Sequence, residues 1–423
     1  MAAVELRKIA LERYKGYARR VELDLAPLTI LVGTNNSGKT ALAQGIQLLA
    51  GGLGSDRDER EPLPLESGGI RHGETFADLV TGRAVHGQLH FSVTLAGESG
   101  ELSLAATVTN VVAPGQPSER QISDWRMKSD YGEIHAERQG FGGSSDYRVS
   151  VSGARPDAHT IAWRGLIPRI PQQLEERAEW ADPQLDALKT WATGVRHLRC
   201  PRHLVSSPFL AAERSPAGLG SDGRDAPLAL AADDALRDSV RRWYRNTFGV
   251  RIDILSDGRY SNLVTGTPGR DHDVAIAQSG RGLSHVLPVV VTALTARRAG
   301  AGVDVIEHPE AELHPAAHAE IAELLMENLA GVARPLVVET HSEMVLLRAR
   351  RWVAEGRLPS RHVLVYWIHA EPGHGSVAER ISMRENGEVE TWPDGVFIED
   401  YEEILAIRRA ARKQGLERHA NRD

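Results

Sequence analysis

The segment from Gly33 to Thr40 combines two glycines, a lysine and a threonine at fixed spacing. Its sequence, Gly-Thr-Asn-Asn-Ser-Gly-Lys-Thr, fits the pattern G-x-x-x-x-G-K-[ST]. A β-branched apolar run, 28–32, precedes it, and residues 41–50 place apolar side chains at helical spacing after it. The glycines allow backbone dihedrals that turn several N–H groups inward, and the helix N-terminus adds positive potential. The segment is therefore predicted to bind the phosphates of a nucleoside triphosphate.

This segment, called the phosphate loop below, supplies most of the predicted nucleotide contacts. Lys39 is expected to place its ammonium at the β- and γ-phosphates, and the Thr40 hydroxyl to ligate Mg²⁺. ATP and Mg²⁺ are therefore the expected cofactors. A chance glycine-rich turn is the alternative, and the eight-residue match with correct flanks disfavours it. The predicted contacts are Gly33, Thr34, Asn35, Asn36, Ser37, Gly38, Lys39, Thr40 and Ala41.

A short apolar strand, 303–306, ends in the carboxylate of Glu307. In enzymes with a phosphate loop, a carboxylate at this strand end holds Mg²⁺ directly or through water, so Glu307 is the predicted second metal residue beside Thr40. His308 follows and could accept a proton from water in its neutral form, with a reference pKa of about 6.5. Glu310 is a second candidate for that proton transfer.

Simpler interpretations of this acidic segment also exist. A strand followed by a solvated acidic turn would have the same composition. A zinc site formed by Glu310, Glu312 and His314 is a weak alternative, because three such residues in a polar turn are common.

A second apolar strand, 336–338, is followed by Glu339-Thr340-His341-Ser342. A histidine at this strand end can reach the γ-phosphate, so His341 is predicted to contact it. Upstream, the polar segment 277–285 leads into a helix and could present backbone N–H groups and a serine hydroxyl to a phosphate. A flexible loop with a serine N-cap would fit the same segment. Its candidate nucleotide contacts are Ser279, Gly280, Gly282 and Ser284.

These four elements, taken in their order along the chain, resemble those of the ABC-type ATPases. The chain looks most like the stand-alone bacterial AAA-type ATPases related to the overcoming-lysogenisation-defect, RecF and SMC proteins. The matching segments are Gly33–Thr40 (Walker A), Gly280–Pro288 (a degenerate signature), Val305–Pro315 (Walker B and D-loop) and Glu339–Ser342 (H-switch). Two weaker segments agree, Phe209–Pro216 and Gly387–Phe397, and the latter is similar to a Trp-Pro-x-Gly-Phe-Phe ending.

The resemblance implies an α/β fold, an ABC-type ATPase head with a mixed, largely parallel sheet around the phosphate loop and an inserted α+β lobe. It also implies that ATP lies between two protomers, so a homodimer or a higher even oligomer is expected. His308 departs from the family pattern because a glutamate often stands at that position. The signature segment is not Leu-Ser-Gly-Gly-Gln, and residues 76–79 offer no Q-loop glutamine.

The elements that must position these residues follow from periodicity. Expected strands are 4–9, 21–25, 28–32, 88–95, 103–111, 303–306 and 336–338, and residues 51–72 are expected to form a surface loop. Expected helices are 41–50, 172–199 with an interruption at Pro183, 231–248 and 283–298. The expected division is 1–95 (head with Walker A), 96–200 (inserted lobe), 201–370 (head with signature, Walker B and H-switch) and 371–423 (C-terminal extension).

Composition limits the function classes. The chain has 423 residues, 41% hydrophobic and 25% charged, which is typical of a globular protein with two or more units. The single cysteine, Cys200, favours a reducing compartment, and no signal peptide is recognised, so a cytoplasmic location is expected. The longest apolar stretch, 286–294, is far shorter than the roughly 20 residues of a membrane span, so no membrane partner is expected. A net charge of -7 does not support DNA as the main ligand, although a local basic patch could bind it.

The leading functional hypothesis is an ATP-hydrolysing molecular switch whose dimerisation regulates DNA or a partner effector, in genome maintenance or anti-phage defence. The strand-bound Glu and Asp-x-Asp set of a Toprim nuclease is not found after His341, and the acidic segments 233–234 and 271–273 are interpreted as solvated loops. The alternative is an ATP-powered nuclease or other effector with its catalytic site in 96–200. A transporter ATPase subunit is a third hypothesis, disfavoured by the Glu-x-Pro-Glu pattern at Glu307.

Overall fold

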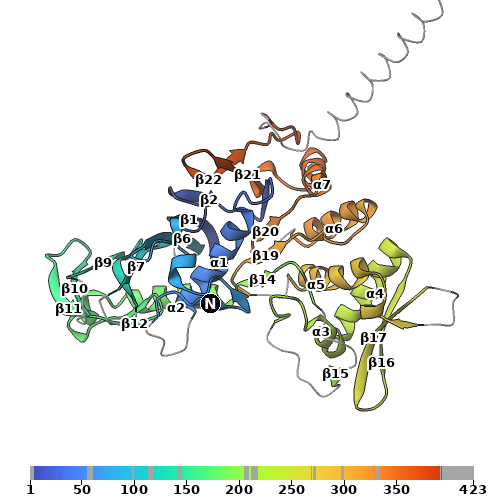
Figure 1. Cartoon of the computed structure of the whole chain (residues 1–423), viewed down its shortest axis with the longest axis horizontal. Helices are drawn as coiled ribbons and strands as arrows, with labels where there is room; N and C mark the ends of the chain where they lie inside the picture. Colours follow the sequence, from blue (N-terminus) through green and yellow to red (C-terminus); the bar gives the residue numbers. More distant parts are fainter. Residues whose placement is uncertain are drawn as a thin grey trace, which may run out of the picture.

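Two large β-sheets organise the chain. The structure is a computed structural model that describes residues 4–54, 61–97, 100–112, 118–140, 145–203, 209–210, 218–267, 269, 273–296, 300–329, 334–390 and 392. One sheet has six strands and carries the phosphate loop, and the other has eight antiparallel strands (Figure 1). The sequence-based prediction of a mixed α/β fold is confirmed.

The six-stranded sheet is parallel except at one edge. Its order is β14 (Arg196–Leu198), β19 (Asp304–Glu307), β20 (Leu336–Glu339), β3 (Leu28–Gly33), β21 (Val363–Glu371) and β22 (Gly375–Ile381), and only β22 runs antiparallel. Every residue of β19 and β20 is buried, as expected for β-branched strands covered on both faces. The carboxyl ends of β3, β20 and β19 therefore meet at one edge of the sheet.

Alternate side chains of β3 point into two different cores. Leu31 packs in the core that also contains α1 (Lys39–Leu53), α2 (Ala181–Thr193) and the inner face of the antiparallel sheet. Ile30 and Val32 pack in the other core. This second core is built by the helices α4 (Asp234–Phe248), α5 (Arg281–Thr295), α6 (Pro315–Glu327) and α7 (Glu343–Ala354). The parallel sheet is thus the middle layer of the head.

The antiparallel sheet joins the beginning of the chain to its middle third. Its order is β11 (Asp157–Thr160), β10 (Asp146–Val151), β9 (Gly132–Arg138), β8 (Glu119–Ser129), β7 (Gly100–Val111), β6 (Gln88–Gly97), β1 (Glu5–Glu12) and β2 (Val21–Asp24). The expected boundary between residues 95 and 96 falls inside β6. Strands β7 to β11 continue the sheet that β1, β2 and β6 begin.

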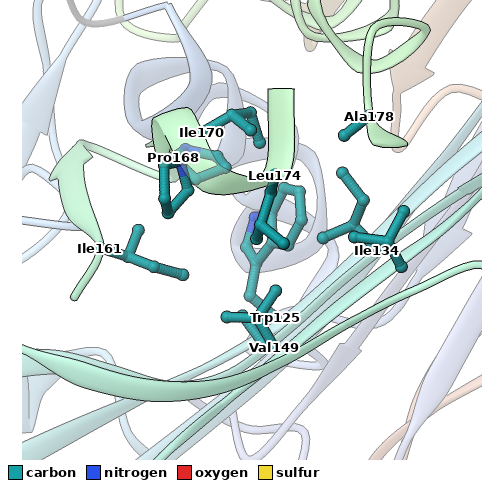
Figure 2. Close-up of a pocket in the computed structure, with 11 residues that line it drawn as sticks. Trp125, Ile134, Val149, Ile161, Pro168, Ile170, Leu174 and Ala178 are labelled. Carbon is teal, nitrogen blue, oxygen red and sulfur yellow. The ribbon is translucent and has the colours of Figure 1, made fainter. Parts of the chain in front are cut away.

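A large aromatic side chain anchors the middle third. The buried Trp125 of β8 donates its indole N–H to the Leu166 carbonyl oxygen at 2.9 Å. Figure 2 shows Trp125, Ile134 and Val149 beneath Leu174 and Pro168, in a small pocket lined by apolar residues. The short elements here are β12 (Ala162–Arg164), β13 (Ile167–Arg169) and the 3-10 helix η3 (Gln172–Arg177).

The expected helix 172–199 was wrong in its extent. The chain forms η3, then α2, and then the edge strand β14. Pro183 lies in the first turn of α2, where its missing N–H breaks no helical hydrogen bond. Residues 196–198 instead pair with β19, a long-range contact that overrides local helical spacing. The expected helix 231–248 is also two helices, α3 (Ala226–Ala232) and α4, because the Asp233 side chain caps α4 through the Leu236 N–H at 2.9 Å.

The remaining elements are short. Residues 51–72, expected to form a surface loop, contain the end of α1 and the strands β4 (Glu66–Ser67) and β5 (Ile70–Arg71). A four-stranded sheet contains β15 (Phe209–Leu210), β16 (Arg251–Ser256), β17 (Tyr260–Gly266) and β18 (Val274–Ala275). The 3-10 turns are η1 (Phe76–Asp78), η2 (Thr81–Arg83), η4 (Ile276–Gln278) and η6 (Ser360–His362).

Several predicted segments lie partly outside the described residues. These are residues 55–60 of the expected surface loop, 211–216 of the segment beginning at Phe209, residues 271 and 272, residues 297 and 298 of the expected helix, and position 391 with residues 393–423 of the expected C-terminal extension. Within the described part of the chain, no helix is both long enough and apolar enough to cross a membrane.

Asp304, the first residue of β19, is held by two arginines. It accepts hydrogen bonds at 2.7 Å from the Nε atoms of Arg196 and Arg334. The buried Arg334 also donates to the carbonyl oxygens of Gly300 and Ala301. This cluster fixes the start of β19 between β14 and β20, at the end of the strand opposite Glu307.

Replacing Asp304 with Ala should destabilise the fold, because it leaves the buried Arg334 guanidinium without its counter-charge. We expect a loss of roughly 3–5 kcal/mol in the free energy of unfolding, measured by urea denaturation. Asp186→Ala is the control, because its ion pair with Lys189 is exposed and its loss should cost less than about 1 kcal/mol. Equal losses in the two variants would contradict this assignment.

Candidate nucleotide site

The phosphate loop connects β3 to α1 in a tightly packed turn. Gly38 has a φ of 108° at the N-cap of α1, a conformation that side-chain-bearing residues rarely adopt. At Gly33, a Cβ atom would lie 2.0 Å from the Ile368 carbonyl oxygen of β21, so only glycine fits. The Tyr17 hydroxyl donates to the Gly38 carbonyl oxygen at 3.0 Å and ties the turn between β1 and β2 to the loop. The two glycines of the sequence pattern are thus required by local packing.

Lys39 lies inside the arc of the loop. Its Nζ donates to the carbonyl oxygens of Gly33 at 3.0 Å and Thr34 at 2.7 Å. Burial lowers the pKa of the Lys39 ammonium, and the nearby Glu339 carboxylate opposes this shift. Ser37 is also buried, and its hydroxyl has no partner among the described residues. Of the other predicted loop contacts, Thr34, Asn35 and Asn36 are exposed and Ala41 is half-buried.

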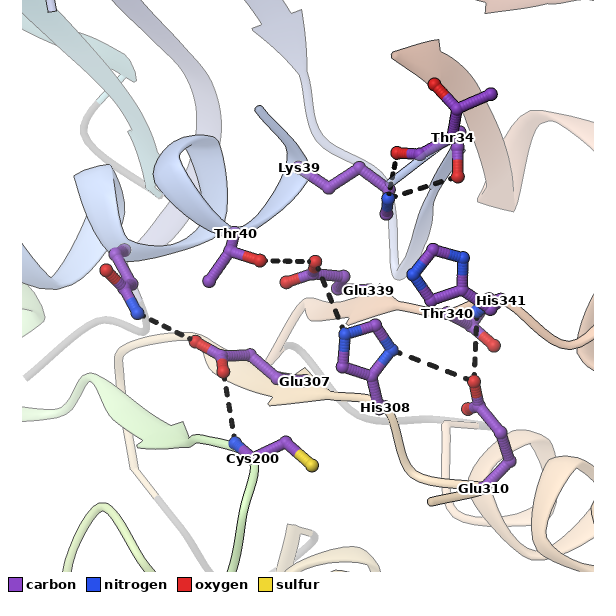
Figure 3. Close-up of polar contacts among 12 residues, drawn as sticks. Thr34, Lys39, Thr40, Cys200, Glu307, His308, Glu310, Glu339, Thr340 and His341 are labelled. Carbon is purple, nitrogen blue, oxygen red and sulfur yellow. Dashed lines mark hydrogen bonds and ion pairs between the residues drawn. The ribbon is translucent and has the colours of Figure 1, made fainter. Parts of the chain in front are cut away.

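Thr40 contacts a carboxylate that the sequence-based prediction does not include. Its Oγ1 donates to Glu339 Oε1 at 2.6 Å, and Glu339 is the last residue of β20. Glu339 is only 1% exposed, and its Oε2 has no partner among the described residues. Burial raises the pKa of the Glu339 carboxyl, while the Thr40 hydrogen bond and the charge of His308 oppose that rise. Figure 3 shows Glu339 between Thr40 and His308.

Glu307 lies on the neighbouring strand with its carboxylate fully engaged. Its Oε1 accepts from Gln44 Nε2 at 3.2 Å and lies 2.9 Å from His197 Nε2, and its Oε2 accepts from the Cys200 N–H at 3.0 Å. Burial alone would raise the pKa of the Glu307 carboxyl. The hydrogen bonds from His197, the Cys200 amide and Gln44 outweigh burial and lower it. These hydrogen bonds therefore favour the ionised form of Glu307.

His308 begins the turn after β19 in a strained conformation. Its φ of 43° lies in the left-handed region, which is uncommon for residues other than glycine. The buried Arg202 stabilises this turn by donating to the carbonyl oxygens of Glu307 and His308. His308 Nε2 lies 3.5 Å from Glu339 Oε1. A strained residue held by a buried arginine is typical of a functional site.

The two predicted histidines stack on each other. The ring centroids of His308 and His341 are 4.9 Å apart with an interplanar angle of 6°. Glu310 joins them, because its Oε1 accepts from the His341 N–H at 2.9 Å and lies 3.8 Å from His308 Nδ1. Burial alone would lower the pKa of His308, but the carboxylates of Glu310, Glu339 and Glu307 outweigh it and raise that pKa. Burial lowers the pKa of His341, and the nearby charges of Lys39 and His308 add to this effect.

In the part of the chain that the structure describes, the signature segment makes its contacts locally and not with the phosphate loop. Ser279 Oγ donates to the Ile276 carbonyl oxygen at 2.6 Å, and Ser284 Oγ donates to the Arg281 carbonyl oxygen at 3.0 Å. A Cβ atom at Gly282 would lie 2.6 Å from the Glu312 carbonyl oxygen, whereas one at Gly280 would meet nothing within 4 Å. Among the described residues, no hydrogen bond or ion pair links 279–284 with 33–41.

The weak zinc alternative finds no support in the described part of the chain. No group of three or more His, Cys, Asp or Glu side chains there is arranged to hold a metal ion. His314 instead caps α6, accepting from the Ala316 N–H at 3.2 Å.

The residues present fit Mg²⁺ and a triphosphate. Thr40 gives its hydroxyl hydrogen to Glu339, so the lone pairs of its oxygen remain available to a cation. Mg²⁺ prefers oxygen ligands and usually combines one or two carboxylates with phosphate oxygens and water. The buried, unpartnered oxygens of Ser37 and Glu339 are of the required type.

The overall architecture is that of an ABC-type ATPase head. An SMC head solved in complex with the C-winged-helix domain of ScpA has a TM-score of 0.52 and 13% identity, over 90% of this chain and 98% of that one. SMC heads from Pyrococcus furiosus (TM-score 0.47, 12% identity, 96% and 100% covered) and Thermotoga maritima (0.43, 12%, 90% and 100%) also match. At such low identity, the likeness of the first shows the fold alone.

Sequence comparison gives a match over part of the chain. Residues 162–348 match the family described as "AAA domain, putative AbiEii toxin, Type IV TA system". The matched range contains Glu307 and His341 and starts after the phosphate loop. Comparison with curated proteins found no match.

His197 was missed by the sequence-based prediction, because a histidine on a short edge strand carries no motif. Its side chain is fully buried, and its Nε2 is the closest partner of the Glu307 carboxylate. His197→Leu should destabilise the fold by roughly 1.5–3 kcal/mol in urea denaturation, because a buried carboxylate loses a hydrogen-bond partner.

His197→Gln can keep a donor near Glu307 and should lose less than half as much. His135→Leu is the matched control, because His135 makes a similar 2.7 Å contact with Asp124 at the surface. A His197→Leu variant no less stable than His135→Leu would show that His197 does not support Glu307.

Proposed function

We propose that the chain binds and hydrolyses ATP and acts as a dimerising molecular switch. The observation that carries the proposal is the continuous set of contacts from Thr40 through Glu339 and His308 to Glu310 and His341. It brings three strand ends from distant parts of the sequence to the start of α1. The fold of an ABC-type head, shared with the SMC head, supports the same conclusion.

Each residue has a definite task in this proposal. Lys39 and the loop amides bind the phosphates, and Thr40 with a carboxylate from the strand ends holds Mg²⁺. When bound, Mg²⁺ neutralises charge that develops on the phosphate oxygens. The water oxygen attacks the γ-phosphorus, the bond to the bridging oxygen breaks, and the water proton passes to His308 or Glu310. His341 contacts the γ-phosphate, and Glu310 holds the backbone of His341 in place.

Dimerisation completes the site in this proposal. Among the described residues, the signature segment makes no hydrogen bond or ion pair with the phosphate loop of its own chain. In this proposal the segment therefore faces the nucleotide of a second copy, with Ser279, Gly280, Gly282 and Ser284 as its contacts. ATP then joins two heads and hydrolysis separates them. Because the SMC head in the solved structure is bound to ScpA, a protein effector is a reasonable partner, with DNA a further one. The toxin–antitoxin description of the matched family is the support for anti-phage defence in this proposal, and DNA maintenance is the alternative role.

ATP turnover and mass in solution test the proposal. Wild type should hydrolyse ATP and double in mass when ATP is added. Lys39→Ala should lose both, because the triphosphate loses its main cation. Glu307→Gln should bind ATP, but its turnover should fall by a factor of about 10 or more, with a longer-lived dimer. Lys189→Ala, which removes an exposed lysine of α2, is the control. Constant mass and no turnover in wild type and all variants would reject the switch.

A separate variant tests the contact between protomers. Gly280→Glu should fold normally, because the added Cβ meets nothing within 4 Å in the single chain. The monomer should bind ATP with an affinity within about threefold of wild type, while ATP-dependent doubling of mass is lost through charge repulsion between protomers. Gly218→Glu, at another open and exposed position, should dimerise like wild type. Normal dimerisation of Gly280→Glu would exclude this segment from the interface.

A further inference from the structure

We propose that Glu339 is the carboxylate that contacts the metal of the nucleotide site directly, and that Glu307 acts behind it as a positioning residue. This inference rests on the proposed function and names the metal residue of the same site. It differs from the sequence-based prediction, which pairs Thr40 with Glu307.

The strand register places the two carboxylates side by side. Glu307 of β19 pairs with Glu339 of β20, and Glu339 pairs with Leu31 of β3. Since β20 lies between β19 and β3, Glu339 is one strand closer to the phosphate loop. The direct 2.6 Å contact from Thr40 reaches Glu339 and not Glu307.

The hydrogen-bond state of the two carboxylates points the same way. Glu307 has donors or ring nitrogens at both oxygens, from Gln44, His197 and the Cys200 amide. Glu339 is equally buried, but only its Oε1 is engaged. A buried carboxylate oxygen without a partner costs free energy, so its persistence in a native site calls for a ligand. An ion at Glu339 would satisfy that oxygen without breaking any contact of Glu307.

The surrounding cations lie near Glu339 but leave its Oε2 without a contact in the described part of the chain. The Lys39 ammonium is directed at the carbonyl oxygens of Gly33 and Thr34. The ring of His308 lies 3.5 Å from the same Oε1 that Thr40 contacts. Two neighbouring carboxylates beside a threonine hydroxyl favour a divalent cation with oxygen ligands. Glu307, fixed by its three partners, then sets the position of the adjacent turn and adds charge at longer range.

The test measures metal-dependent nucleotide binding without turnover. The affinity of the intact chain for a non-hydrolysable ATP analogue is measured by calorimetry with Mg²⁺ and with EDTA, and the ratio of the two affinities is the Mg²⁺ gain. Glu339→Gln should lose about tenfold or more of this gain, while its binding in EDTA equals or exceeds wild type because one negative charge is removed. Glu307→Gln should keep more of the gain than Glu339→Gln does, because Glu307 does not touch the ion.

The substitution is chosen to preserve the fold. A glutamine amide oxygen can still accept from the Thr40 hydroxyl, and the side-chain volume is unchanged. Glu343→Gln, at an exposed position in the first turn of α7, is the matched control and should leave the gain unchanged. If Glu339→Gln does not fold, Glu339→Asp replaces it, with an expected gain below that of wild type.

Each outcome decides the inference. The inference is overturned if Glu339→Gln, or Glu339→Asp where that variant replaces it, shows the same Mg²⁺ gain as wild type. It is also overturned if the Mg²⁺ gain is lost only in Glu307→Gln. In both cases the proposed function still stands. Absence of analogue binding by wild type overturns the proposed function together with this inference. Loss of the gain in Glu339→Gln, with retention in Glu307→Gln and Glu343→Gln, supports it.

Discussion

The parallel pairing of β19, β20 and β3 is the constraint on which the site depends. It aligns Glu307, Glu339 and the start of the phosphate loop at one sheet edge, although Thr40 of the loop is 299 positions from Glu339 in the sequence. The hydrogen bond from Thr40 to Glu339 closes this arrangement across the first turn of α1. Without the central position of β20, the loop and the acidic turn would be separate polar features on one surface.

Residues 196–202, which contain β14, hold Glu307 and the turn at His308 in place. His197 and the Cys200 amide hold the Glu307 side chain, while Arg202 holds the backbone of Glu307 and His308. The same segment contributes Arg196 to the cluster at Asp304, at the opposite end of β19. A stretch of seven residues thus fixes both ends of one strand, which explains why the strained turn at His308 is tolerated.

The parts of the fold and site that could be predicted are those with local signals. The phosphate loop follows from glycine and lysine spacing, and β3, β19 and β20 follow from short β-branched runs. Glu339 could not be selected, because a glutamate at a strand end looks the same in sequence whether it faces solvent or is buried against a neighbouring strand. Strand β14 could not be predicted for a similar reason. Its pairing with β19 is a long-range contact, and its apolar residues continue the helical spacing of α2. The eight-stranded sheet likewise depends on pairings between residues far apart, such as β1 with β6.

The hydroxyl of Tyr17 has a mechanical consequence. Tyr17 lies on the connection between β1 and β2, at one end of the eight-stranded sheet, and its bond to Gly38 fastens that connection to the phosphate loop. Any twist or tilt of the large sheet must therefore either carry Gly38 with it or break this bond. A displacement of this edge of the antiparallel sheet would therefore reach the phosphate loop through a single hydrogen bond.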